Sequence, residues 1–284
     1  MDAGPRGAIA PVPTPLDATG AFDAGALARH LEWLSAEGLD GALVLGTNGE
    51  FPSMSFGERL EIARAAAGAG SGLQLLLGVG SCALPEALAL VDEAARSGYL
   101  AVLCPPPFYY RSATARGVAA FLAEVVGRSP LPVLLYHIPQ LTGVAVSDEV
   151  LAALAEHGVA AAGVKDSTGS TTEMDRLLAH AMGAAYFVGH DAFITRCLQA
   201  GGAGSISAAA NVAPRLVAAV HRDPAQQPRL DAVRSLLESH GLGASVKAIL
   251  ARRGIGAYRS RPPMEELSEA AADRLFAAWD ALET

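Results

Sequence analysis

Lys165 has the sequence environment of a reactive amine. The apolar run 161–164 leads into this single lysine, and the polar turn 166–169 follows at once. This pattern predicts a buried strand that ends in a lysine at the mouth of a sheet. Partial desolvation at such a position disfavours the charged ammonium form. A neutral amine can attack a ketone and form a Schiff base, whereas the alternative is a strand-end lysine that reaches into solvent.

The elements that must position Lys165 alternate between strand and helix. Apolar runs predict strands at residues 7–12, 41–46, 73–80, 100–104, 132–137, 161–165, 185–189 and 203–207. Helices are expected at residues 24–37, from 56, at 85–97, 114–128, 148–157, 171–182 and 191–200, and from 214. Continuous apolar strands that alternate with helices indicate a parallel sheet covered by helices.

This repeated unit predicts an α/β protein with the (β/α)₈ TIM-barrel fold, which needs eight strand–helix units. A doubly wound open sheet is the alternative, but no glycine-rich dinucleotide-binding motif follows the first strand. The tail predicts three further helices, near residues 226–240, 244–253 and 266–282. We therefore expect a barrel of residues 1–223 and a C-terminal helical segment of residues 224–284 packed on it.

The composition excludes several classes of function. The 284-residue chain carries a formal net charge of −8 and has no basic cluster, which argues against nucleic-acid binding and against attraction to an anionic membrane. No apolar run approaches the length of a membrane span, and the first residues lack the layout of a signal peptide. Cys82, Cys104 and Cys197 lack metal-ligand spacing, and we expect free thiols in a reducing cytoplasm.

The active site of a (β/α)₈ barrel lies at the carboxyl ends of its strands. Several further side chains that could contact a substrate follow or end the predicted strands. They are Thr47 and Asn48, Tyr109 or Tyr110, Tyr136 and His137, His190 and Asp191, and Ile206 and Ser207. A lysine, a strand-borne tyrosine and a hydroxyl-bearing glycine loop thus converge on one face, which favours the Schiff-base interpretation of Lys165.

This set of residues fits the chemistry of a 2-oxo acid. A lysine that adds to the keto carbon and loses water gives an iminium, which stabilises a carbanion at the neighbouring carbon. Protons must move at several steps, and the phenol of Tyr136 can carry them with Thr47 as a relay. Backbone N–H groups of the glycine loop, with the Thr47 and Asn48 side chains, can hold the carboxylate without a formal positive charge.

Four motifs carry a resemblance to a known family. Gly46-Thr47-Asn48-Gly49-Glu50, Tyr136-His137-Ile138-Pro139, Gly163 to Gly169 and Gly204-Ser205-Ile206-Ser207 stand in the order and spacing of the dihydrodipicolinate synthase / N-acetylneuraminate lyase family. The resemblance covers the chain from about residue 6 to residue 280. It implies a homotetrameric barrel and a metal-free class I pyruvate lyase or aldolase, with no cofactor beyond the covalent imine of Lys165.

The resemblance also implies individual roles. Lys165 corresponds to the Schiff-base lysine, Tyr136 to the proton-transfer tyrosine and Thr47 to the relay hydroxyl. Asn48 stands where a second hydroxyl residue often helps to hold the pyruvate carboxylate. Tyr109 resembles the tyrosine inserted into the neighbouring subunit's site, although the adjacent Tyr110 is an alternative. Further substrate-binding positions are expected at Gly46, Gly189, His190, Ile206 and Leu141.

One departure from the family pattern concerns the second substrate. Dihydrodipicolinate synthases usually carry an arginine where this chain has Leu141. An uncharged side chain cannot offer a bidentate fork to the carboxylate of aspartate semialdehyde. The segments 48–52, 165–167 and 261–268 look more like 4-hydroxy-2-oxoglutarate aldolases and sugar-acid aldolases of the same superfamily.

Five other residues have structural interpretations. His137 alternates with Tyr136 on its strand and is expected to pack on the opposite face. Asp191 is expected to cap a helix, whereas His190 either belongs to the same cap or contacts the distal part of the substrate. Glu50 is expected to orient its loop, and Lys247 to be a surface or interface cation.

We therefore predict a lyase that makes or breaks a carbon–carbon bond at C3 of pyruvate through a Lys165 imine. Its partner substrate would be a small aldehyde or a 2-oxo acid. Dihydrodipicolinate synthase activity and a sugar-acid dehydratase are alternatives within the class. A barrel that only binds a 2-oxo acid is the alternative from another class. The sequence leaves open the aldehyde, the direction of the reaction and its regulation.

Overall fold

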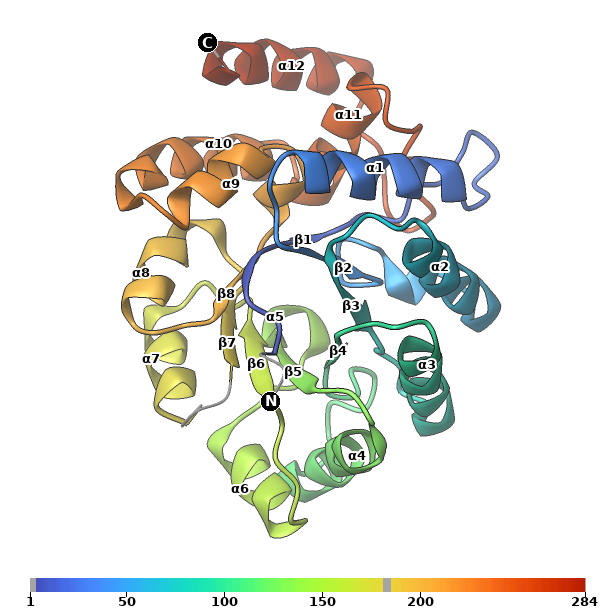
Figure 1. Cartoon of the computed structure of the whole chain (residues 1–284), viewed down its shortest axis with the longest axis vertical. Helices are drawn as coiled ribbons and strands as arrows, with labels where there is room; N and C mark the ends of the chain where they lie inside the picture. The colour runs from blue at the N-terminus through green and yellow to red at the C-terminus, as the bar shows by residue number, and fades with distance from the viewer. Residues whose placement is uncertain (1–3, 181–184, 284) are drawn as a thin grey trace.

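Eight parallel strands form a closed barrel in the computed structural model, which describes residues 4–180 and 185–283. Each strand pairs with the next along the chain, and β8 closes the barrel against β1 (Figure 1). The strands are β1 (Gly7–Pro11), β2 (Gly41–Val44), β3 (Gln74–Gly78), β4 (Ala101–Cys104), β5 (Val133–His137), β6 (Gly163–Asp166), β7 (Ala185–Val188) and β8 (Gly204–Ile206). The prediction of a (β/α)₈ barrel is confirmed.

Helices surround the strands on the outside of the barrel (Figure 1). They are α1 (Ala24–Ala36), α2 (Phe56–Gly68), α3 (Leu84–Arg96), α4 (Ala115–Arg128), α6 (Asp148–Glu156), α7 (Thr171–His180), α8 (Ile194–Gln199) and α9 (Pro214–Val220). Asp23, Ser55, Thr114 and Ser147 cap four of these helices by accepting a hydrogen bond from a first-turn N–H group. Such caps stabilise a helix by about 1 kcal/mol each.

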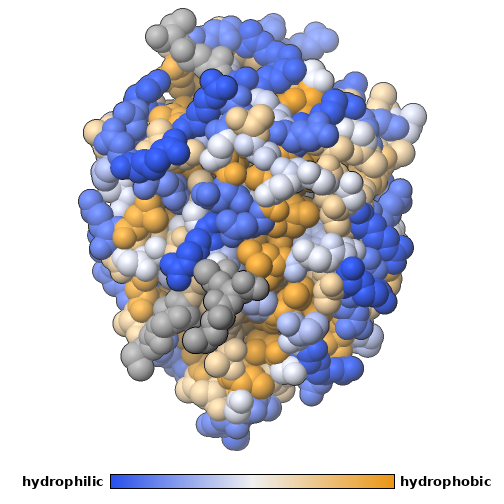
Figure 2. Space-filling model, in the orientation of Figure 1, coloured by the Kyte–Doolittle hydropathy of each residue, from blue (hydrophilic) through white to orange (hydrophobic). Residues whose placement is uncertain are grey.

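Two separate cores hold the barrel together. The larger core lies between the strands and the helices and is built from apolar side chains of both. The smaller core fills the barrel interior and includes Ile9, Leu43, Leu76, Leu134, Phe187 and Ile206. Because successive strand residues point to opposite faces, each strand serves both cores. In the orientation of Figure 1, hydrophilic side chains cover much of the outer surface and apolar ones show between them (Figure 2).

The tail contains α10 (Gln227–Ser239), α11 (Leu242–Arg252) and α12 (Glu269–Glu283), which lie at one end of the molecule near α1 and α9 (Figure 1). Helix α10 contacts α9, α11 and α12. Helix α11 also contacts the short helix η3 (Ala208–Asn211) that follows β8. The division of the chain at residue 223 stays a prediction, since these helices share their packing with barrel elements.

The structure adds short elements that the sequence pattern did not predict. These are η1 (Phe51–Ser53), α5 (Pro139–Thr142), η3 and η4 (Pro224–Gln226). Each is too short to display the 3.6-residue periodicity on which helix prediction depends. The last two residues of the helix predicted at 171–182 lie outside the described residues. No helix within residues 4–180 and 185–283 has the length and hydropathy to cross a membrane.

Candidate active site

The pairing of β5 with β6 places Tyr136 directly opposite Lys165. Paired residues of parallel strands point to the same face of the sheet, and here both side chains enter the barrel. Lys165 is only 3% exposed, its Nζ donates a hydrogen bond to the Tyr136 hydroxyl at 3.3 Å, and it lies 4.4 Å from the ring centroid. The lysine does not reach into solvent, so the structure contradicts the alternative interpretation of its position.

The Tyr136 hydroxyl is the centre of a small polar network. Its oxygen lies 3.1 Å from the Thr47 hydroxyl and accepts a hydrogen bond from the Ser167 hydroxyl at 3.5 Å. Burial by itself raises the pKa of this phenol. The charge of Lys165 and the hydrogen bonds to the phenol oxygen outweigh burial, so that the pKa of Tyr136 lies below its ordinary value. A phenol in this state can both accept and return a proton near neutral pH more readily than a free tyrosine.

Ser167 belongs to this network although the sequence analysis gave it no role. It follows Lys165 by two positions, and the period of an extended chain therefore directs both side chains to the same face. Its carbonyl accepts a hydrogen bond from the Gln140 side chain on α5 at 2.7 Å. The strand period alone could have identified it.

The loop after β2 that carries Thr47 has an unusual backbone. Leu45 and Glu50 both adopt left-handed conformations, with φ of 57° and 51°. A Cβ atom at Gly78 on β3 would lie 2.1 Å from the Leu45 carbonyl oxygen, so only glycine allows this close approach. The Thr14 hydroxyl donates to the Gly49 carbonyl at 2.6 Å. The loop is thus held from several sides.

Lys247 does not lie on the surface, and the prediction of a surface or interface cation was wrong. It is 5% exposed, and its ammonium forms an ion pair with the Glu50 carboxylate and donates to the Ser260 hydroxyl. Lys247 lies on the buried and mostly apolar face of α11, beside Val246 and Leu250, and that periodicity was the missed signal. The expected loop-orienting role of Glu50 agrees with this contact. Lys165 and Lys247 are the only lysines of the chain.

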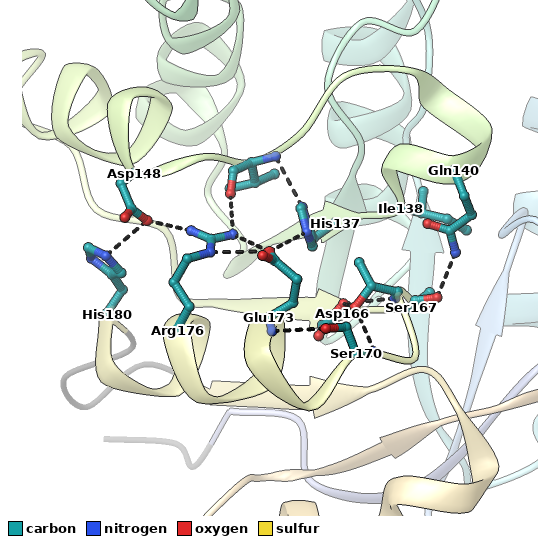
Figure 3. A network of polar contacts seen from close by, with 12 residues as sticks. His137, Ile138, Gln140, Asp148, Asp166, Ser167, Ser170, Glu173, Arg176 and His180 are labelled. Atoms are coloured by element: carbon teal, nitrogen blue, oxygen red, sulfur yellow. Dashed lines mark hydrogen bonds and ion pairs between the residues drawn. The ribbon is translucent and has the colours of Figure 1, made fainter.

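His137 lies on the outer side of β5, as predicted (Figure 3). Its Nδ1 accepts a hydrogen bond from the Val146 N–H at 3.1 Å, so Nε2 carries the proton and donates to Glu173 at 3.0 Å. Burial lowers the pKa of His137 in spite of the neighbouring Asp166 and Glu173 carboxylates. Arg176 on α7 also binds Glu173 and extends the network to Asp148 on α6. These contacts fix the outer side of the two strands that carry Tyr136 and Lys165.

A cavity of about 400 Å³ opens above Tyr136 and Thr47. Most of its wall is apolar and comes from loops far apart in the sequence. The apolar lining residues are Phe51, Pro52, Pro105, Phe108, Ile138, Leu141, Pro263 and Met264. Leu141 lies at the mouth and is 59% exposed. Leu141 is the only residue of this wall that was predicted as a substrate contact, whereas Ile138 and the segments 48–52 and 261–268 were noted only as parts of family motifs.

Several predicted substrate-binding positions surround this network. Ile206 is fully buried in the barrel interior, and Gly46 is buried directly before Thr47. The Asn48 side-chain nitrogen is buried and has no hydrogen-bond partner among the described residues. A Cβ atom at Gly189 would lie 2.0 Å from the Ser167 hydroxyl, so this glycine allows β7 to approach the end of β6.

The helix after β7 is capped by a different residue from the one expected. The His190 side chain accepts a hydrogen bond from the Ala192 N–H, whereas Asp191 is buried and forms an ion pair with Arg234 on α10. The prediction that Asp191 caps this helix was therefore wrong, because the ion pair occupies its carboxylate. His190 is half-buried beside Glu238, and its contact with a substrate stays a prediction.

The predicted tyrosines of the loop after β4 point away from the body of this chain. Tyr109 is 77% exposed and Tyr110 is 60% exposed, with their rings edge to face at 5.5 Å. A role of either in a neighbouring subunit's site stays a prediction. Within the described part of the chain, no three His, Cys, Asp or Glu side chains gather as metal ligands would.

Comparisons with known proteins agree with one another on what this chain is similar to. The sequence profile of the dihydrodipicolinate synthetase family matches residues 4–282. The chain is 37% identical over 260 residues to an uncharacterised DapA-like lyase of Chloroflexus aurantiacus, covering 87% of this chain and 86% of the relative. It is 32% identical to the 4-hydroxy-tetrahydrodipicolinate synthase of Azoarcus, covering 96% of each chain.

A solved structure is also similar over the whole barrel. The dihydrodipicolinate synthase of Acinetobacter baumannii, solved in complex with pyruvate, superposes with a TM-score of 0.90 at 25% identity. The match covers 98% of this chain and 99% of the other.

Proposed function

Because this chain belongs to the dihydrodipicolinate synthetase family, whose members are lyases, we propose that it makes or breaks a carbon–carbon bond at C3 of pyruvate through an imine of Lys165. The observation that carries the proposal is the buried contact between the Lys165 amine and the Tyr136 hydroxyl, at 3.3 Å. The pyruvate complex of the structural relative supports pyruvate as the common substrate.

The first half of the reaction activates pyruvate. Tyr136 takes a proton from the Lys165 ammonium, the freed amine adds to C2, and the carbinolamine loses its hydroxyl as water when Tyr136 returns the proton. The product is a protonated imine between Nζ and C2. Removal of a proton from C3, with Tyr136 as the acceptor, leaves the electron pair in the enamine. The lowered pKa of Tyr136 supports this role as a base.

The second half forms the new bond. C3 of the enamine attacks the aldehyde carbon, the aldehyde oxygen takes a proton, and the nitrogen becomes an iminium again. Water then adds to C2 and releases a 4-hydroxy-2-oxo acid together with free Lys165. Cleavage is the same sequence in reverse. The hydroxyls of Thr47 and Ser167 on the phenol oxygen support a relay of protons between Tyr136 and the substrate.

The pyruvate carboxylate would be held by the loop of residues 46–48. Backbone N–H groups and a side-chain amide can bind a carboxylate without a cation. Buried polar groups normally have partners, so the unpaired amide nitrogen of Asn48 supports a ligand at this position.

The aldehyde partner is proposed as that of a 4-hydroxy-2-oxoglutarate or sugar-acid aldolase. The alternative is 4-hydroxy-tetrahydrodipicolinate synthase, which the Azoarcus relative favours. Leu141 at the cavity mouth argues against this alternative, because it offers no charge to the carboxylate of aspartate semialdehyde.

We also propose that the enzyme is a cytoplasmic homotetramer. The exposure of Tyr109 supports a neighbouring subunit that receives this side chain. The three free cysteines support a reducing compartment.

Reduction with borohydride in the presence of pyruvate tests the imine. We expect one reduced pyruvyl adduct by intact mass, located on Lys165 by peptide mapping. The chain has just one other lysine, and Lys247 is buried in an ion pair, so the assignment is unambiguous. Lys165→Ala should give no adduct. An unmodified wild-type protein, or an adduct on Lys247, would overturn the mechanism.

A further inference from the structure

The cavity above Tyr136 is the space in which the aldehyde must lie during bond formation. Its floor carries the hydroxyls of Thr47 and Tyr136, which act on the reacting atoms in the proposed function. The remaining lining residues form what we call the upper wall of the cavity. The upper wall therefore contacts the rest of the aldehyde, and its chemistry selects the substituent that the aldehyde carries.

The upper wall offers no cation in the part of this subunit that the structure describes. Among the described residues that line the cavity, the only charged side chain is Glu50, which is already paired with Lys247. A substrate carboxylate there would lose its hydration without gaining a counter-ion, and it would also face the Glu50 carboxylate. Arg111 packs over Gly143 beside the cavity, but it is exposed and does not line the wall.

The upper wall also offers few hydrogen-bonding partners to the hydroxyls of a substrate. Its hydroxyl-bearing residues are Ser53 and Thr142. The Thr142 hydroxyl is engaged by its own backbone neighbours, because it lies 2.8 Å from the Val144 carbonyl and accepts from the Val144 N–H at 3.2 Å. A sugar aldehyde would bury several hydroxyls with few partners, which is costly.

An apolar group finds complementary surfaces in the same space. The rings of Phe51 and Phe108 meet edge to face, with centroids 5.9 Å apart and an interplanar angle of 77°. Ile138, Leu141 and Met264 complete the apolar surface. Aromatic rings arranged in this way pack well against a further ring or a branched alkyl chain.

We infer that the aldehyde of this enzyme carries a compact apolar substituent, aliphatic or phenyl, in place of a carboxylate or a polyol. This inference rests on the proposed imine chemistry of Lys165 and revises the second substrate, because the lining of the cavity does not complement the aldehydes that the sequence motifs suggest. It favours neither glyoxylate nor aspartate semialdehyde nor a sugar aldehyde.

The test compares aldehydes in reaction with pyruvate on the full-length protein. Benzaldehyde and 3-methylbutanal represent the apolar class, and glyoxylate, aspartate semialdehyde and glyceraldehyde represent the others. Product formation is followed by liquid chromatography with mass detection, and kcat/KM is determined for each aldehyde. We expect values at least about tenfold higher for the apolar pair, since a hydrophobic pocket discriminates by this order or more.

A matched pair of variants locates the preference in the cavity. Leu141→Arg should lower kcat/KM for benzaldehyde and raise it for aspartate semialdehyde. Leu282→Arg introduces the same change on an exposed position of α12, outside the cavity, and should leave the ranking unchanged. Arg111→Ala should also leave the ranking unchanged.

The outcomes separate the inference from the function beneath it. Borohydride trapping of pyruvate on Lys165 together with a preference for a carboxylated or polyhydroxylated aldehyde would overturn the inference alone. If the Arg111→Ala variant then loses a preference for a carboxylated aldehyde, Arg111 is the cation that binds this carboxylate, which also contradicts the inference. Trapping without turnover of any apolar aldehyde also overturns it, and absence of trapping removes both proposals.

Discussion

The Lys247 ammonium on α11 forms an ion pair with the carboxylate of Glu50. Glu50 stands at the end of the loop that carries Thr47. The two residues are 197 positions apart, and both side chains are largely buried, with 6% and 12% exposure. The second oxygen of Glu50 is buried and has no partner among the described residues. This pair connects the C-terminal helices to the loop beside the candidate catalytic tyrosine.

Replacing Lys247 with methionine should destabilise the protein and lower turnover. The change leaves the Glu50 carboxylate buried without its cation, which costs about 3 to 5 kcal/mol in comparable sites. The free energy of unfolding in urea, followed by circular dichroism, measures the effect. Arg252→Met on the same helix is the matched control, because its ion pair with Asp280 is exposed and is worth less than about 1 kcal/mol. Equal losses in the two variants would show that burial of the Glu50 pair is unimportant.

Replacing Thr47 with valine should shift the pH dependence of turnover. The Thr47 hydroxyl is one of the hydrogen-bonding groups that lower the pKa of Tyr136, so its removal should raise that pKa. A base with a higher pKa is deprotonated only at higher pH, and the acid limb of the kcat profile should move upward. Thr47→Ser keeps the hydroxyl and should keep the limb in place. A valine variant with an unmoved limb would argue that Tyr136 is not the titrating base.

Mixing two inactive variants should restore activity if Tyr109 serves a neighbouring site. Lys165→Ala removes the amine that forms the imine, and Tyr109→Phe removes the hydroxyl that each subunit would contribute to its neighbour's active site. A mixed assembly would contain sites with an intact Lys165 and a Tyr109 from the other variant. We expect activity to appear after co-refolding or co-expression, measured as aldol product. If Tyr110→Phe is the inactive variant and Tyr109→Phe is fully active, the lent residue is Tyr110.

Stability should fall as pH decreases below about 6.5, partly because of His30. This residue is fully buried, and burial lowers its pKa to about 3. Between the two pKa values the unfolded chain binds a proton that the folded chain does not. Each such proton lowers the free energy of unfolding by about 1.4 kcal/mol per pH unit. Above the unfolded value the effect disappears.

Urea unfolding at pH 7.5, 6 and 5 measures this dependence. His30→Gln can keep a hydrogen bond to the Tyr258 hydroxyl, which lies 2.8 Å from His30 Nδ1, and should give a shallower slope. His157→Gln, at an exposed histidine, serves as the control. An unchanged slope in the His30 variant would mean that this imidazole takes up its proton in the folded state.

Much of the fold and the central pair of the candidate site could be predicted from the sequence. Apolar runs of strand length alternate with amphipathic helices eight times, and few folds accommodate that repeat. Lys165 ends one predicted strand and Tyr136 lies one residue before the end of its neighbour, and the register that pairs them directs both side chains to one face. His137 was placed on the opposite face by the same rule.

The errors occurred where a residue's environment depends on distant parts of the chain. Lys247 was expected at the surface, but the packing of α11 against the loop at Glu50 buries it. Asp191 was expected to cap a helix, but Arg234 on α10 binds its carboxylate. The sequence around Lys247 and Asp191 does not indicate which distant residue will bind either side chain.

The sequence by itself determined which side chains are the reactive groups of this protein. The positions of the strands and the alternation of side chains along them are properties of local sequence. Only the tertiary structure decided what surrounds the reactive groups. The apolar wall of the cavity brings together loops at residues 51–52, 105–108, 138–142 and 263–264. Their meeting depends on long-range packing, so the space offered to the second substrate becomes visible only in the folded chain.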